Sequence, residues 1–125
     1  MQDKDDLAPT LEVEAEAHGN GTQLLTLRGE LDVSTVPRFK QALSAALGPD
    51  ARPRLLIDLA EVTFIDSTAL MTLLGVLREV NRREGRLALA CNNPTVLRLF
   101  EVTRTTDTFR IFPTRESALG HLDSA

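Results

Sequence analysis

The residues with the clearest chemical potential are Asp66, Ser67 and Thr68, a carboxylate and two hydroxyls in adjacent positions. They follow a short apolar run and precede a long stretch of helical periodicity, which predicts that they open a helix. The first N–H groups of a helix lack intrahelical partners, and the helix dipole is positive there. Asp66 or Ser67 can therefore cap the helix, and a hydroxyl at this end is also well placed to carry a phosphate.

The helix that begins at Ser67 is predicted to run to about Glu84, with Gly85 closing it. Successive residues step by about 100°, so one stripe should face a sheet, with Leu74 at its edge. That stripe consists of Leu70, Leu73, Leu77 and Val80. The exposed or half-exposed strip consists of Ser67, Met71, Gly75 and Arg78. An exposed Met suits an adaptable protein-binding surface, although single apolar residues are also common on ordinary surfaces.

Three sequence blocks together resemble one known family. Residues 64–70 (FIDSTAL) resemble the signature of STAS domains of the anti-sigma factor antagonist type, in which Asp-Ser-(Ser/Thr)-(Gly/Ala)-Leu opens the second helix. Residues 27–35 (LRGELDVST) resemble the family's Gly-Glu-Leu-Asp turn, and residues 90–100 (ACNNPTVLRLF) resemble its small-residue loop and third helix. The blocks occur in the family's order, and the resemblance covers about residues 10–122.

The resemblance implies roles for individual residues. Ser67 matches the serine that the family phosphorylates, and Thr68 is a lesser candidate. Asp32 matches an Asp that lies near this serine and helps partner binding, although Asp32 can equally form a local turn with Ser34 or Thr35. We expect Asp66 to support recognition, and we expect Met71, Gly75 and Arg78 to lie in the partner surface.

The resemblance also implies a non-enzymatic switch. The unphosphorylated protein would bind an anti-sigma factor that is also a serine kinase, and so free a sigma factor. The kinase would transfer phosphate from ATP to Ser67 and end binding, and a phosphatase would restore it. ATP belongs to the kinase, so we expect no cofactor here. The alternative is a STAS scaffold or regulatory subunit of a transporter or stress-signalling complex without a working phosphoswitch; an unrelated small enzyme ranks third.

Composition limits the other classes of function. The chain of 125 residues suits one domain, and its net charge of -4 argues against direct nucleic-acid binding. Cys91 is the only cysteine, which excludes an internal disulfide and favours a reducing compartment. The start of the chain is polar and acidic, unlike a secretory leader, and no apolar stretch is long enough to cross a bilayer. We therefore expect a cytoplasmic protein.

The order of the elements predicts an α/β fold. Residues 1–9 are predicted to be a flexible tail, and the domain to occupy residues 10–122. An opening hairpin is followed by alternating strands and helices, which predicts a mixed sheet with mostly parallel inner strands and about four helices. The predicted elements are strands at 11–17, 23–28, 55–59, 86–90 and 109–112, and helices at 35–47, 67–84, 95–102 and about 114–122. Residues 29–32 are predicted to leave the second strand.

The remaining reactive side chains give little support for other chemistry. Cys91 should pack as a small apolar residue, because no second cysteine supports a redox role. His18 and His121 are far apart in sequence and lack clustered partners, so no metal site is expected. Ser67 lacks a Gly-x-Ser-x-Gly elbow, and no Gly-rich phosphate loop is present, so neither a hydrolase nor a kinase is favoured. The basic residues Arg78, Arg82, Arg83 and Arg86 suit a helix C-terminus.

Overall fold

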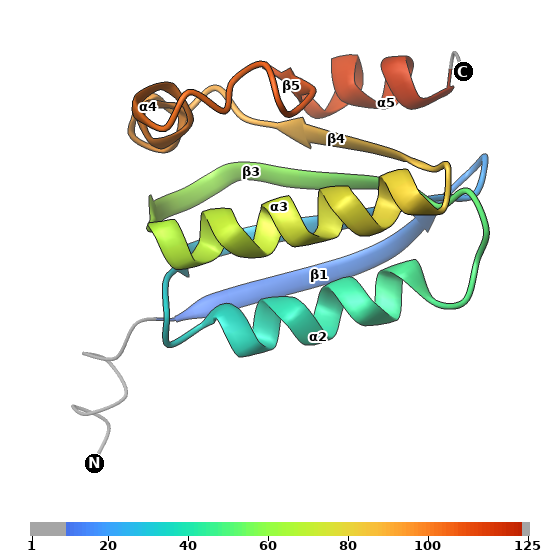
Figure 1. Cartoon of the computed structure of the whole chain (residues 1–125), viewed down its shortest axis with the longest axis horizontal. Coiled ribbons are helices and arrows are strands. Elements are labelled where there is room, and N and C mark those ends of the chain that lie inside the picture. The colour runs from blue at the N-terminus through green and yellow to red at the C-terminus, as the bar shows by residue number, and fades with distance from the viewer. Residues whose placement is uncertain (1–9, 124–125) are drawn as a thin grey trace.

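The computed structural model describes residues 10–123, which form one five-stranded sheet and four helices (Figure 1). This confirms the predicted α/β fold. In chain order the elements are β1 (Leu11–His18), β2 (Thr22–Leu31), α2 (Val36–Leu47), β3 (Arg54–Ile65), α3 (Ser67–Arg82), β4 (Arg86–Ala90), α4 (Pro94–Val102), β5 (Ile111–Phe112) and α5 (Arg115–Asp123). The flexible tail expected at residues 1–9 lies outside the described residues.

The sheet has the strand order β1-β2-β3-β4-β5, so each strand pairs with its neighbour in sequence. β1 and β2 form an antiparallel hairpin, whereas β2, β3, β4 and β5 are parallel. Each parallel connection carries a helix, as parallel pairing requires. The carboxyl ends of β2, β3 and β4 therefore meet at one edge of the sheet, and α2, α3 and α4 begin just beyond them.

The two faces of the sheet are covered differently. α2 and α3 lie side by side across one face (Figure 1), and the main core fills the space beneath them. α4 adds Val96 and Phe100 to this core, where Phe100 stacks edge-to-face on Phe109 at 5.5 Å. α5 covers part of the other face with Ala118 and Leu122, over a smaller apolar cluster. The starts of α2 and α3 therefore lie at the surface, next to the carboxyl ends of β2 and β3.

The buried face of α3 differs slightly from the predicted stripe. Leu70, Leu73 and Val80 are buried as expected, but Leu77 is only half-buried. The buried residues are Ala69, Leu70, Leu73, Val76 and Val80. Val76 lies on the side of α3 that packs beside α2, together with Leu43 and Leu47, whereas Leu77 packs at the edge of the core. The predicted exposed strip is confirmed, because Ser67, Met71, Gly75 and Arg78 are all exposed.

β2 and β3 are longer than the apolar runs predicted. Residues 29–31 were expected to leave the second strand, which is wrong, because β2 continues to Leu31 and pairs with β3 there. The pairing register shifts between Thr26 and Arg28 and again between Gly29 and Glu30. Gly29 has φ 114°, and a Cβ there would lie 2.4 Å from the carbonyl oxygen of Thr10. These irregularities hide the alternating pattern that would otherwise mark the strand.

Other element ends move by a few residues. α3 stops at Arg82, and the left-handed backbone after it falls on Glu84, with φ 60°, rather than on Gly85. Gly85 is required for a different reason, since a Cβ there would lie 2.2 Å from the carbonyl oxygen of Pro53. α4 begins one residue early at Pro94, a favourable first helical position behind the cap Asn93. The last strand is only Ile111–Phe112.

An ion pair joins α5 to the sheet. The Arg115 guanidinium contacts Asp58 Oδ2 at 2.9 Å and donates to Thr26 Oγ1 at 2.9 Å. Asp58 is buried on β3, and its other oxygen accepts the N–H of Ala60 at 2.9 Å. The buried carboxylate is thus paired and hydrogen-bonded, as a charge inside a protein must be. Arg115 fixes the start of α5 over the centre of the sheet.

Candidate functional site

At the start of α3, one residue caps the helix and the next residue is exposed. Asp66 is the N-cap, and its Oδ1 accepts the N–H of Ala69 at 3.1 Å. Ser67 is the first helical residue, and its side chain is exposed. Because the carboxylate of Asp66 acts as the cap and satisfies one of the orphan N–H groups, the Ser67 hydroxyl is not needed for capping. Among residues 10–123 it has no hydrogen-bond partner. The open choice of cap is thereby resolved in favour of Asp66.

Asp32 organises the turn between β2 and α2. Its Oδ1 accepts the Ser34 hydroxyl at 2.7 Å and the N–H groups of Ser34 at 2.9 Å and Thr35 at 3.2 Å. The hydrogen bond from the Ser34 hydroxyl contributes most to lowering the pKa of Asp32, and the backbone donors reinforce it. Thr35 precedes α2 without a capping hydrogen bond, because its hydroxyl donates to the carbonyl oxygen of Glu30 at 2.7 Å. The local turn, one of the two roles considered for Asp32, is therefore present.

One backbone hydrogen bond brings the two predicted carboxylates to the same end of the sheet. The Asp66 N–H donates to the carbonyl oxygen of Leu31 at 3.1 Å. Leu31 pairs with Ile65 at the end of the parallel β2–β3 ladder. Asp32 directly follows Leu31, the acceptor of this bond, and Ser67 directly follows Asp66, its donor. The sequence blocks around residues 27–35 and 64–70 thus meet in space at one edge.

Exposed apolar side chains accompany Ser67 at this end. Val33 is 69% exposed, Phe64 is 46% exposed and Met71 is 62% exposed. Val33 lies in the turn after Asp32, Phe64 lies three residues before Ser67, and Met71 lies one helical turn after it. Sequence reasoning identified Met71 but missed Val33 and Phe64. The available signal for Phe64 was strand alternation, since a buried Ile65 places its predecessor on the opposite face.

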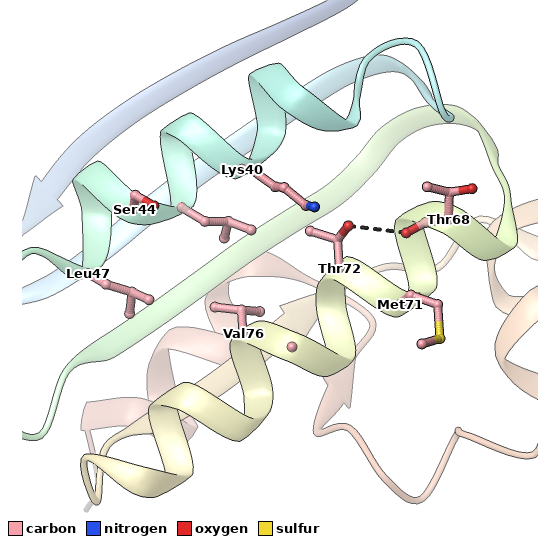
Figure 2. Close-up of a pocket in the computed structure, with 9 residues that line it drawn as sticks. Lys40, Ser44, Leu47, Thr68, Met71, Thr72 and Val76 are labelled. Atoms are coloured by element: carbon pink, nitrogen blue, oxygen red, sulfur yellow. Dashed lines mark hydrogen bonds between the residues drawn. The ribbon is translucent and has the colours of Figure 1, made fainter.

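A groove of about 460 Å³ lies between α2 and α3 (Figure 2). Its walls combine apolar and polar side chains from both helices, with Gly75 exposed at the surface. The described residues that line it are Lys40, Leu43, Ser44, Leu47, Thr68, Met71, Thr72, Gly75 and Val76. A Cβ on Gly75 would meet nothing within 4 Å, so this glycine leaves open space in the groove. Met71 and Gly75, both predicted for the partner surface, are thus neighbours on one groove wall.

Arg78 shares the exposed strip but lies far from the start of the helix. At 1.5 Å per residue it stands roughly 16 Å along the axis from Ser67. It belongs at most to an outer part of a surface centred on Ser67. The neighbouring Arg82 and Arg83 both contact Glu79, at 2.6 and 2.7 Å, and their hydrogen bonds lower the pKa of Glu79 to about 2. Arg83 also donates to the carbonyl oxygen of Gly48 at 2.8 Å, which ties the end of α3 to the end of α2.

The other reactive side chains form no catalytic arrangement in the described part of the chain. Cys91 is buried, and its burial raises the pKa of its thiol, as expected for a packed rather than reactive cysteine. His121 packs against the Phe112 ring at 5.0 Å, whereas His18 ends β1. No group of three metal-binding side chains occurs within residues 10–123. None of the helices among them is long and apolar enough to span a membrane.

Comparison with known proteins places these features in a family. The model of the STAS domain matches residues 12–118. An anti-sigma-B factor antagonist of Listeria monocytogenes is 35% identical over 83 residues, which is 66% of this chain and 72% of the relative. An anti-sigma F factor antagonist of Paenibacillus polymyxa is 27% identical over 113 residues, covering 90% of this chain and 96% of the relative.

A solved structure agrees with the sequence comparison. The crystal structure of an anti-sigma factor antagonist from Mycobacterium paratuberculosis superposes with a TM-score of 0.82 at 28% identity, covering 91% of this chain and 95% of the other. The family match spans most of the chain and includes both sequence blocks that meet at Ser67. The chain therefore belongs to the STAS domain family.

Proposed function

We propose that this protein is a cytoplasmic anti-sigma factor antagonist that phosphorylation of Ser67 switches off. The observation that carries the proposal is the exposed Ser67 hydroxyl, which stands beside a cap that Asp66 already supplies. A kinase can therefore reach and modify this hydroxyl without dismantling the helix start. The names of the relatives supply the partner class, since those proteins are antagonists of anti-sigma factors.

The modification is a transfer of one phosphoryl group. The Ser67 Oγ forms a bond to the γ-phosphorus of ATP held by the partner kinase, the bond to ADP breaks, and the hydroxyl proton passes to a base of the kinase. The product carries about -1.5 to -2 charges at neutral pH. Because the helix N-terminus accommodates anions, the domain should stay folded. A phosphatase would hydrolyse the phosphoester and restore the hydroxyl.

The same phosphate would disturb a docked partner. Before modification, Met71 offers an exposed apolar side chain one helical turn from a neutral hydroxyl, and Val33 and Phe64 are exposed at the same edge of the sheet. After modification, a partner pressed against this surface must desolvate a dianion that already neighbours Asp66. The cost falls on the complex rather than on the free domain, so binding is lost without unfolding. Asp32 contributes a carboxylate that its own turn holds in place.

An experiment with purified proteins tests this function. Anti-sigma factors with a serine kinase domain, taken from the genome that encodes this chain, are incubated with it and ATP, and the product is mapped by peptide mass spectrometry. We expect phosphate on Ser67, with Ser67→Ala unmodified and Thr68→Val still modified. Phosphate on Thr68 or elsewhere would refute the site. Recovery of a transporter or scaffold complex in pull-downs, with no kinase, would favour the alternative STAS function.

A further inference from the structure

The helices α2 and α3, which form the groove, carry more basic than acidic side chains. The two helices carry four basic side chains, Arg38, Lys40, Arg78 and Arg82, against one acidic side chain, Glu79. The whole chain, by contrast, has a net charge of -4. Glu79 is already held by Arg82 and Arg83. The two helices together thus carry a net positive charge on an acidic protein, and Lys40 is the basic residue that lines the groove between them.

Lys40 concentrates this charge in the groove. It is the only charged side chain among the described residues that line the groove, and within residues 10–123 it forms no ion pair. Figure 2 shows its amino group reaching from α2 toward Thr72 on α3. The Thr72 hydroxyl donates to the carbonyl oxygen of Thr68 at 3.1 Å, and no carboxylate belongs to the described residues that line the groove. The Lys40 ammonium is therefore available to pair with a carboxylate of a bound partner.

The walls around Lys40 include several apolar side chains and have a defined length. Leu43 and Val76 are nearly buried at 5% and 6% exposure, and Met71 stands exposed beside the open space over Gly75. The α2 wall runs from Lys40 to Leu47 and the α3 wall from Thr68 to Val76, each roughly 10 to 12 Å at 1.5 Å per residue. This length accommodates about two turns of a third helix, with anchors at positions i and i+4.

We infer that this groove receives an acidic amphipathic helix of the anti-sigma factor, with an aliphatic side chain over Gly75 and a carboxylate on Lys40. The inference rests on the proposed function for the identity of the partner. It extends the contact from the phosphorylation site along the groove and specifies its chemistry. Lys40 remains exposed, so its charge should act mainly on the association rate and its salt dependence.

The first test uses a defined probe and does not need the natural partner. Two 18-residue helical peptides are compared by NMR titration of the labelled full chain: one carries Leu at i and i+4 and Glu one turn away, and the other has Lys in place of Glu. We expect only the acidic peptide to shift the amide resonances of Lys40, Met71 and Gly75. Equal shifts with both peptides, shifts elsewhere, or no shifts would overturn the inference.

The second test uses the anti-sigma factor identified by the kinase experiment. Lys40→Glu should slow association about tenfold and flatten its salt dependence, while Lys40→Arg should bind like the wild type. Arg110→Glu serves as the matched control, because it reverses an exposed charge just before the edge strand β5. Wild-type kinetics for Lys40→Glu would overturn the inference and leave the phosphoswitch intact. Loss of binding in Arg110→Glu as well would also overturn it.

Other occupants of the groove give distinct results. A second copy of this chain would appear as a dimer in sedimentation at micromolar concentration and would dissociate in Met71→Glu. That outcome would overturn the inference of a partner helix. If no kinase phosphorylates Ser67, the proposed function fails, and the peptide titration still decides the chemistry of the groove.

Discussion

Asp66 and Ser67 are adjacent at the start of α3, yet of these two side chains only that of Asp66 is hydrogen-bonded within residues 10–123. The Oδ1 atom of Asp66 accepts the N–H of Ala69 at 3.1 Å, while Ser67 exposes its side chain as the first helical residue. If the serine were the cap, its modification would remove a hydrogen bond that stabilises the helix. With the aspartate as cap, phosphate can be added or removed while the capping bond remains.

The packing of α3 gives a direct stability prediction. Leu73 is fully buried between α3 and the sheet, so Leu73→Ala should lower the free energy of unfolding by about 2 to 5 kcal/mol. The loss combines transfer of the removed atoms with the cavity they leave. Met71→Ala, on the exposed side of the same helix, should change it by no more than about 0.5 kcal/mol. Urea unfolding measures both, and equal effects of the two changes would contradict the orientation of α3.

Substitutions at Gly75 should affect partner binding and folding stability differently. Its position is helical and open, so Gly75→Ala should be neutral or stabilising by up to about 1 kcal/mol. Gly75→Arg should leave the melting temperature nearly unchanged but weaken partner binding at least tenfold, about 1.4 kcal/mol, by filling the groove. Calorimetric titration and thermal unfolding give the two readouts. Undiminished binding of Gly75→Arg would count against this interface.

The ion pair of Asp58 and Arg115 should hold α5 in place. Arg115→Met leaves a buried carboxylate without its cation and should lower the free energy of unfolding by about 1 to 3 kcal/mol. The figure is below that for a fully buried pair because the Arg115 side chain is 34% exposed. Hydrogen exchange should accelerate in α5 before it accelerates in α3. Unchanged exchange in α5 would show that Ala118 and Leu122 suffice to hold it.

Glu79 gives a pH prediction. Its pKa of about 2 in the folded protein lies below its usual value of 4.5, because Arg82 and Arg83 donate hydrogen bonds to it. A depressed folded pKa contributes stability that is fully present above about pH 4.5 and is lost as pH falls toward 2. Side-chain NMR titration should find this low pKa in the wild type and a higher one in Arg82→Gln. Arg86→Gln, a control without contact to Glu79, should leave it unchanged.

Much of this structure follows from local patterns in the sequence. The exposed strip of α3, the stripe of Phe39, Leu43 and Leu47 on α2, and the parallel inner strands follow from periodicity and element order. The continuation of β2 through Gly29 does not, because register shifts break the alternation that marks a strand. The exact buried face of α3 also depends on how α2 packs beside it, which the periodicity of α3 alone cannot show.

Individual residues of the site could be predicted from the sequence, but the way they come together in space could not. The helix start at Ser67 follows from capping preferences, and the turn at Asp32 follows from the side-chain chemistry of Asp. The α2–α3 groove arises only when two helices separated by a strand are packed together, so neither its shape nor the place of Lys40 in it can be read from either helix alone. The exposure of Val33 likewise depends on how the turn projects from the sheet.

Substitutions at Ser67 should separate charge from shape. Ser67→Ala removes the acceptor and should bind the anti-sigma factor constitutively. Ser67→Glu adds one charge and should weaken binding, though less than phosphate, which carries more charge. Both variants should unfold near the wild-type temperature, because a helix start tolerates anionic groups. Equal affinity of the wild type and Ser67→Glu would weaken the charge mechanism.

The affinity of the Ser67-phosphorylated protein for its anti-sigma factor, compared with the unmodified protein, tests the switch most directly. Phosphoserine is introduced at position 67 during synthesis, so the test does not depend on the efficiency of the kinase, and circular dichroism confirms folding. We predict that the phosphoprotein binds at least tenfold more weakly and that phosphatase treatment restores full affinity. Equal affinity of the folded phosphorylated and unmodified proteins would contradict a switch at Ser67.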